Sequence, residues 1–228
     1  MISIVIPAYN ESKRIEKTVQ KIAAYMKGKQ CEILVIDDGS TDSTTKIAKK
    51  YATVITLKKN TGKGFAIKTG FNHAKGDIIL FTDADLATPI EELTDMLPLL
   101  QKADIVIASR YIKSDKQVKQ STKRKIIGSL FSMYEKYILG LTFKDTQCGF
   151  KLYTKKAAKL IASKQLITQF AFDIEQLIIA KRNNLNVIEH PVNWFDKSGS
   201  TVRIVRDGTR MFVDTLKIKY NDFNKKYQ

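Results

Sequence analysis

Short apolar runs alternate with amphipathic segments along the first half of the chain. The runs have the length of buried strands, and the segments between them carry apolar residues at helical spacing, as Ile15, Val19 and Ile22 do. Strands that alternate with helices favour a mainly parallel sheet flanked by helices, with right-handed crossovers, and we therefore expect an α/β fold. The pattern predicts strands at 2–7, 32–36, 54–57, 77–82 and 104–108, and helices at 11–26, 42–51, 64–74 and 90–101.

The second half of the chain departs from this rhythm. Residues 111–125 are polar and rich in lysine, which predicts a mobile loop. The final helix is amphipathic, with Phe212, Leu216 and Tyr220 on one face. The remaining elements predicted here are a broadly apolar helix at 126–141, a loop and strand at 145–153, a helix at 171–182, a strand at 187–194 and the last helix at 209–226.

Polar side chains gather where three of the predicted strands end. Residues 7–11 (PAYNE) follow the first strand, residues 37–40 (DDGS) the second and residues 83–85 (DAD) the fourth. In open α/β sheets, ligands bind outside the carboxyl ends of the strands. We therefore expect the chemistry of this protein at that edge of the sheet.

Asp83 and Asp85 are the sharpest local signal for a metal site. Two carboxylates one residue apart at a strand end can share a divalent cation, and Mg²⁺ and Mn²⁺ prefer such hard oxygen ligands together with substrate phosphate. A metal at this position would stabilise a departing diphosphate as a Lewis acid. The Asp-X-Asp pattern is common by chance, so the prediction depends on its place after an apolar strand.

Residues 37–40 and 60–64 predict a nucleotide site. One carboxylate of the Asp37-Asp38 pair can accept the N3–H of a pyrimidine or an equivalent base edge, with residues 7–11 as the facing wall; the alternative is an ordinary turn stabilised by aspartate. Residues 60–64 (NTGKG) offer glycines for close approach of the backbone and Lys63 for phosphate. The segment does not fit the phosphate-loop pattern and the chain has no G-x-G-x-x-G, which disfavours ATP hydrolysis and dinucleotide binding.

Charge is the unusual feature of the composition. Lys and Arg number 39 against 23 Asp and Glu, a net charge of +16, so the protein attracts anions such as nucleic acid, an anionic membrane or phosphorylated substrates. The lysines are scattered and no recognised nucleic-acid-binding module is present, so we expect no nucleic-acid partner. The sequence has no apolar run near the ~18 residues of a spanning helix, no signal-peptide pattern and no zinc-binding cysteine pattern. We expect a cytoplasmic protein.

The order of these motifs carries a family resemblance. PAYNE, DDGSTD, NTGKG, DADL and the Ser-Arg pair at 109–110 resemble the family-two inverting glycosyltransferases of the A-type fold. DTQCGFKLY at 145–153, FDIEQL at 172–177 and VNW at 192–194 resemble the dolichyl-phosphate glucosyltransferase branch, which is similar to the dolichyl-phosphate mannose synthases. Ala87 stands where the mannose branch has Gln, and Gly199-Ser200-Thr201 lacks the lysine that the family carries there.

The resemblance implies an activity, two substrates and a metal ion. It implies transfer of a hexose, in first place glucose from UDP-glucose, to a polyprenyl or dolichyl phosphate with inversion, using Mg²⁺ or Mn²⁺. Mannosyl transfer from GDP-mannose, and transfer to a hydroxyl in glycolipid or surface-polysaccharide synthesis, remain alternatives. Nucleotidyl transfer also uses paired acids, but DTQCGFKLY argues against it.

The resemblance also implies roles for individual residues. Asp83 and Asp85 would hold the metal. The residues implied to be catalytic are Asp85, Asp145, Arg110 and Arg124. Those implied to bind substrate are Pro7, Ala8, Tyr9, Glu11, Asp38, Gly62, Lys63, Asp83, Ala84, Lys123, Gly149, Asp173, Glu175 and Trp194. For Asp173 and Glu175, the alternative is an acidic first turn that the helix dipole favours.

The expected organisation follows from the same resemblance. Residues 1–205 would form the catalytic domain, and residues 206–228 an amphipathic helix suited to a membrane interface. The helix at 126–141 would share that role or pack on the sheet. We expect a peripheral protein at the inner face of the membrane whose partners are the nucleotide-sugar donor, a polyprenyl phosphate acceptor and the anionic membrane surface; a small membrane-protein partner is left open.

Overall fold

A computed structural model describes residues 1–119, 122–197 and 204–228. The side chains of residues 122–127, 129–130 and 204–207 lie outside this description.

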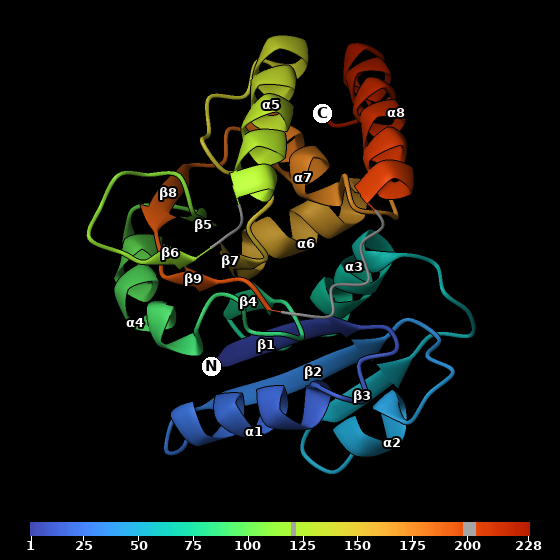
Figure 1. The fold of residues 1–228 in the computed structure, drawn as a ribbon, viewed down its shortest axis with the longest axis vertical. Helices are drawn as coiled ribbons and strands as arrows, with labels where there is room; N and C mark the ends of the chain where they lie inside the picture. The colour runs from blue at the N-terminus through green and yellow to red at the C-terminus, as the bar shows by residue number, and fades with distance from the viewer. Residues whose placement is uncertain (120–121, 198–203) are drawn as a thin grey trace.

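A seven-stranded sheet in the order β3-β2-β1-β4-β7-β5-β8 forms the centre of the molecule (Figure 1). All neighbouring strands are parallel except β7, which runs antiparallel to β4 and β5. The predicted mainly parallel α/β sheet is therefore confirmed. The strands are β1 (Ile2–Ala8), β2 (Cys31–Asp37), β3 (Thr53–Thr56), β4 (Ile78–Thr82), β5 (Ile105–Ser109), β7 (Phe150–Thr154) and β8 (Val187–Pro191).

Helices cover both faces of the sheet, so the inner strands are buried on both sides. Val5 of β1 packs into one hydrophobic core, and its neighbours Ile4 and Ile6 pack into the other, as the alternation of side chains along a strand requires. The helices of the first core are α3 (Lys63–His73), α6 (Lys155–Lys164) and α7 (Phe172–Arg182). Those of the second are α1 (Ile15–Tyr25), α2 (Thr44–Ala48), η1 (Ile90–Glu92), α4 (Leu93–Met96) and η2 (Leu97–Gln101).

Two longer helices, α5 (Thr122–Leu139) and α8 (Ile204–Phe223), project together beyond the helices that cover the sheet (Figure 1). The rings of Tyr134 on α5 and Phe212 on α8 are stacked, with centroids 4.8 Å apart. The C-terminal half of α8 is anchored because Ile218 is fully buried in the core that contains α7. Among the helices of the described ranges, none combines the length and the hydropathy that crossing a membrane requires.

One prediction of local structure was wrong, one was right only in part, and one helix was missed. The mobile loop expected at 111–125 contains β6 (Val118–Lys119), which pairs with β9 (Trp194–Phe195) in a small parallel sheet, and its end forms the first turn of α5. The helix expected at 90–101 is helical throughout but is divided into η1, α4 and η2, and Pro98 at the start of η2 accounts for the end of α4. Helix α6 was not predicted, although the Thr154 side chain caps it by accepting the N–H of Ala157 at 3.2 Å.

The topology brings the polar motifs to one edge of the sheet. Ala8 pairs with Asp37, so the ends of β1 and β2 are level, and Thr82 pairs with Phe150 at the same edge. Strand β7 enters the sheet at that edge because it runs antiparallel to its neighbours. The segments that precede β7 and follow β5 therefore meet the loops after β1, β2 and β4.

Candidate active site

Asp38 organises the loop that contains Gly62. Its Oδ1 accepts the N–H of Thr61 and its Oδ2 the N–H of Gly62, both at 2.8 Å. Gly62 has a φ of 118°, and a β-carbon there would lie 2.7 Å from Cδ of Gln169, so this position requires glycine. Burial raises the pKa of Asp38, although both N–H groups act to lower it. The carboxylate has about four acceptor positions, so acceptor capacity remains for a base edge.

The wall formed by residues 7–11 is fastened to the loop after β2. The N–H of Asn10 donates to Ser40 Oγ at 2.9 Å, and the N–H of Thr41 donates to Asn10 Oδ1 at 2.9 Å. Pro7 and Ala8 are buried in β1, and the carbonyl of Ala8 accepts the N–H of Asp38 at 2.8 Å. The side chain of Tyr9 is exposed at this position, where it can stack on a bound base.

Asp83 is held between Lys63 and Gly149. Lys63 Nζ lies 2.7 Å from Asp83 Oδ1. Burial acts to lower the pKa of Lys63, but the charges of Asp83 and Asp173 outweigh it and raise this pKa. The N–H of Asp83 donates to the carbonyl of Gly149 at 3.1 Å, and only a glycine at 149 leaves room for the Asp83 carboxylate. The two expected substrate-binding residues Lys63 and Gly149 therefore both contact a metal-binding candidate.

Asp85 and Glu11 add negative charge beside Asp83. Burial raises the pKa of Asp85, and the charge of Asp83 raises it further; Ala87 opposes this by donating its N–H to Asp85 Oδ1 at 3.0 Å. Burial also raises the pKa of Glu11, although Arg14 forms a double ion pair with it at 2.7 and 2.8 Å. Ala84, between the two aspartates, is buried, and its carbonyl accepts the Thr18 hydroxyl.

The residues present fit a divalent cation that substrate helps to hold. Asp83 and Asp85 supply hard carboxylate oxygens, and their neighbouring negative charges would be relieved by a cation. Within the described parts of the chain, no three His, Cys, Asp or Glu side chains are arranged to hold a metal ion. Mg²⁺ commonly binds through one or two carboxylates and completes its coordination with water and substrate phosphates, which matches this donor set.

Arg110, which directly follows β5, is fixed by Asp145. Its backbone N–H and Nε donate to Asp145 Oδ2 at 2.9 and 2.7 Å, and its Nη2 donates to Oδ1 at 2.9 Å. Burial acts to raise the pKa of Asp145, but Arg110 outweighs it and lowers this pKa. The guanidinium also lies over the rings of Tyr111 and Trp194, 5.3 and 5.4 Å from their centroids. Trp194 thus contacts Arg110, a role that its sequence motif did not reveal.

Asp173 and Glu175 have different surroundings. Asp173 forms a buried ion pair with Lys151, whose Nζ also donates to the carbonyl of Thr146 at 2.7 Å. Burial raises the pKa of Asp173, while Lys151 and Lys63 act to lower it, so Asp173 belongs to the charge network of the site. Glu175 is fully buried and is not brought to the site. Its carboxylate accepts the N–H groups of Leu166 and Ile167 and the hydroxyl of Tyr227, at 3.0, 2.8 and 2.7 Å.

Two residues that the family resemblance implied for catalysis or substrate binding, Arg124 and Lys123, cannot be placed in full. Lys123 and Arg124 lie in the first turn of α5, and their side chains are outside the described part of the chain. Gly199, Ser200 and Thr201 lie outside the described residues altogether.

The sequence did not single out Lys151 of β7 and Glu135 of α5, which both bind the 145–147 segment. Lys151 did carry a signal, since a lysine within the apolar run of β7 requires a buried partner.

Comparisons with known proteins identify the family. The family model described as glycosyl transferase family 2 matches residues 3–161. A dolichyl-phosphate beta-glucosyltransferase of Trichomonas vaginalis is 34% identical over 236 residues, which cover 95% of this chain and 70% of that protein. The human dolichyl-phosphate beta-glucosyltransferase is 34% identical over 222 residues, which cover 87% of this chain and 68% of the human protein.

A solved structure confirms the A-type glycosyltransferase fold. Glucosyl-3-phosphoglycerate synthase from Mycobacterium tuberculosis, in complex with Mn²⁺, UDP and glucosyl-3-phosphoglycerate, matches with a TM-score of 0.74 at 20% identity, over 96% of this chain and 79% of that one. At this identity the likeness speaks for the fold alone, and the sequence relatives carry the assignment. The chain belongs to glycosyl transferase family 2 and, within it, to the family of the dolichyl-phosphate beta-glucosyltransferases.

Proposed function

We propose that this protein transfers glucose from UDP-glucose to a dolichyl or polyprenyl phosphate, with inversion at the anomeric carbon and with Mg²⁺ or Mn²⁺ bound at Asp83 and Asp85. The observation that carries the proposal is that one edge of the sheet holds two charged clusters: Asp83 and Asp85 beside Lys63, which form the donor side, and Arg110 fixed by Asp145, which forms the acceptor side. The dolichyl-phosphate beta-glucosyltransferases at 34% identity support the sugar and the acceptor.

The donor side suits a nucleoside diphosphate. Asp38 and the exposed ring of Tyr9 would bind the base, and Gly62 allows the backbone to approach the ligand closely. A divalent cation bound by Asp83 and Asp85 supplies charge stabilisation to the leaving diphosphate. The structural neighbour that holds Mn²⁺ and UDP in the same fold supports this choice of ligands.

The acceptor side suits a phosphate monoester. Such a phosphate is already anionic near neutral pH, with a second pKa of about 6, so it needs positioning rather than a strong general base. One of its oxygens forms the bond to the anomeric carbon as the bond from that carbon to the diphosphate breaks, and UDP leaves. Arg110, held rigid by Asp145, together with Lys123 and Arg124 of α5 would bring the two phosphates together against their repulsion.

The projecting pair of helices suits a membrane surface. Large apolar side chains on α5 and α8 are exposed, and lysines lie among them. Aromatic and aliphatic groups beside basic ones favour the interface of an anionic bilayer. We therefore propose that residues 1–205 carry catalysis and that residues 206–228, with α5, hold the protein at the inner face of a membrane. The exposed apolar residues are Met133, Tyr137, Phe212, Val213, Leu216, Tyr220 and Phe223.

A panel of donors tests the proposal. Purified protein would be incubated with UDP-glucose, UDP-galactose, GDP-mannose or GDP-glucose, each with polyprenyl phosphate and Mg²⁺ or Mn²⁺, and the glycolipid product would be quantified. We expect product from UDP-glucose, none without the metal, and little from the GDP-sugars. Preference for GDP-mannose would instead support the mannosyl alternative.

A further inference from the structure

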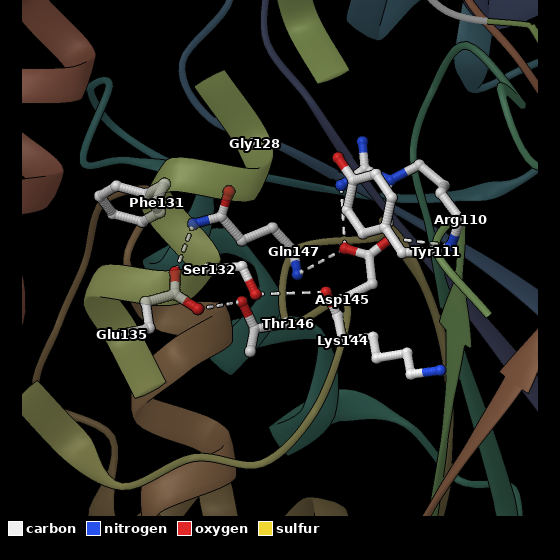
Figure 2. A pocket seen from close by; sticks show the side chains of 10 residues that line it. All are labelled: Arg110, Tyr111, Gly128, Phe131, Ser132, Glu135, Lys144, Asp145, Thr146 and Gln147. Carbon is white, nitrogen blue, oxygen red and sulfur yellow. Dashed lines mark hydrogen bonds and ion pairs between the residues drawn. The ribbon is translucent and has the colours of Figure 1, made fainter. Parts of the chain in front are cut away.

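Glu135 is a buried carboxylate on α5 that the donor and acceptor chemistry described so far does not use. Only 1% of it is exposed. It accepts a hydrogen bond from the Thr146 hydroxyl and another from Gln147 Nε2 at 3.0 Å. Figure 2 shows these three side chains pointing toward one another, with the Arg110–Asp145 pair on the far side of Gln147. A cavity of about 20 Å³ lies among them, enough for a single water molecule.

The charge of Glu135 is costly in this position. Burial raises its pKa to about 7, and Asp145 and Asp173 raise it as well, while the Thr146 hydrogen bond and Lys151 act to lower it. Arg110 and Lys144 line the same cavity. A carboxylate with a raised pKa reduces the stability of the fold whenever it is ionised. Its presence therefore points to a role other than stability.

The face of α5 that carries Glu135 is the face that meets the acceptor side. Gly128, Phe131, Ser132 and Glu135 line the cavity at helical spacing, so this stripe of α5 lies against the 144–147 segment. Arg124 precedes Gly128 by one turn, which places its backbone on the same stripe. The position of the basic first turn of α5 therefore depends on how this stripe is held.

The 145–147 segment is held from two sides. From β7, Lys151 donates to the Thr146 carbonyl at 2.7 Å and pairs with Asp173. From α5, Glu135 binds the side chains of Thr146 and Gln147. Asp145, which fixes Arg110, comes immediately before these residues. Glu135 is thus a polar link between α5 and the segment that fixes Arg110.

We propose that Glu135 is a positioning residue for the lipid-phosphate acceptor: its ionised carboxylate holds α5 against residues 145–147 and so keeps Asp145, and through it Arg110, in place for the acceptor phosphate. The inference rests on the proposed function, since it needs a phosphate acceptor. An ionised carboxylate accepts both hydrogen bonds strongly, whereas protonation converts one of its oxygens into a donor. Acceptor binding should therefore weaken when Glu135 is protonated.

Glu135→Gln tests the proposal, because it keeps the size of the side chain but replaces one acceptor by an N–H₂ donor. At pH 8 we expect the KM for polyprenyl phosphate to rise about tenfold, the loss expected for one charge-assisted hydrogen bond, while kcat and the affinity for UDP change little. At pH 6 wild type and variant should converge. The acceptor phosphate titrates near pH ~6 in both enzymes, so the ratio of their KM values isolates Glu135.

Thr146→Val is the matched second variant, because it removes the hydroxyl donor and keeps the shape of the side chain. It should raise the acceptor KM at pH 8 as well, and combining it with Glu135→Gln should add little, since both remove the same link. A merely structural role predicts instead that kcat, UDP affinity and acceptor KM all deteriorate together, at every pH.

Thermal unfolding supplies a readout that needs no acceptor. The folded-state pKa of Glu135 is raised from its ordinary 4.5 to about 7, so its favourable contribution is present below 4.5 and is lost as the pH rises through 7. Glu135→Gln should therefore melt above wild type at pH 8 and close to it at pH 5. A melting difference that does not grow with pH, or a KM ratio independent of pH, overturns the inference. Failure of the proposed function shows separately, as wild-type protein that transfers nothing to polyprenyl phosphate.

Discussion

Asp83 and Gly149 are in direct contact at the centre of the site. The N–H of Asp83 donates to the Gly149 carbonyl at 3.1 Å, and a β-carbon at 149 would lie 2.9 Å from Asp83 Oδ1 and closer still to Oδ2. The first residue of the proposed metal-binding pair and the glycine of the DTQCGFKLY motif are therefore packed as one unit. The space that Gly149 leaves open is what places the Asp83 carboxylate.

Gly149→Ala should displace this carboxylate while the rest of the fold remains intact. A misplacement of about 1 Å at a reacting centre can cost 10²-fold in rate, and we expect a loss of transfer of at least this order. Gly208→Ala is the control, because a β-carbon at 208 meets nothing within 4 Å. Transfer assays and circular dichroism of both variants would check the prediction. Full activity of Gly149→Ala would show that the position of Asp83 is unimportant.

Asp85→Asn should separate metal binding from folding. The substitution removes one of two metal-binding charges, and with it several kcal/mol of transition-state stabilisation, so we expect transfer to fall by about 10²-fold or more. Because burial and Asp83 raise the pKa of Asp85, the variant should melt at or above the temperature of wild type at pH 7. Activity at saturating Mn²⁺ and thermal melting measure the two effects. Activity within a few-fold of wild type would contradict the metal role of Asp85.

Asp145→Asn should break the buried pair with Arg110. Removing one partner of a buried ion pair costs about 3–5 kcal/mol, and we expect a loss of this size in urea unfolding at pH 7. Arg110 lowers the pKa of Asp145 below its ordinary 3.8, so the stabilisation is present above pH 3.8 and is lost as the pH falls through the lowered pKa. The difference between variant and wild type should shrink in strong acid. Asp115→Asn, at an exposed position, is the control.

The exposed apolar side chains of α5 and α8 should govern binding to membranes. We expect the protein to co-sediment with anionic liposomes, much less with neutral ones, and to be released by salt. Tyr220 and Phe223 are 65% and 85% exposed, and replacing both by Ser should weaken binding at least about tenfold if they insert. Tyr51→Ser, far from these helices, should bind as wild type does. Equal binding to neutral and anionic liposomes would refute the interfacial role.

The apolar periodicity predicted the strands and their shared edge, because parallel strands with helical crossovers leave few arrangements open. It could not predict that β7 runs antiparallel between β4 and β5, since an apolar run carries no information about direction. The lysine-rich sequence up to residue 125 was interpreted as a loop, but α5 already begins at Thr122. Lysine is polar and also a good helix former, so its abundance does not distinguish a loop from a helix.

The site was predictable where residues stand next to each other in the sequence, as Asp83 and Asp85 do. It was not predictable where side chains meet over long separations. Asp38 binds the N–H groups of Thr61 and Gly62, and Glu135 binds Thr146 and Gln147, through contacts that no local pattern encodes. Family resemblance supplied Arg110 and Asp145 as single residues, but not the ion pair that joins them.

A comparison of a lipid phosphate with the corresponding lipid alcohol as acceptor is the decisive measurement. Glucose transfer from UDP-glucose by the purified protein, with Mn²⁺, would be measured with polyprenyl phosphate and with the corresponding polyprenol in parallel. We expect a β-linked lipid-phosphate glucose from the phosphate and essentially no product from the alcohol, because an anionic phosphate can attack without a strong general base, whereas a hydroxyl needs one. Equal transfer to the alcohol would contradict this expectation and favour a hydroxyl acceptor.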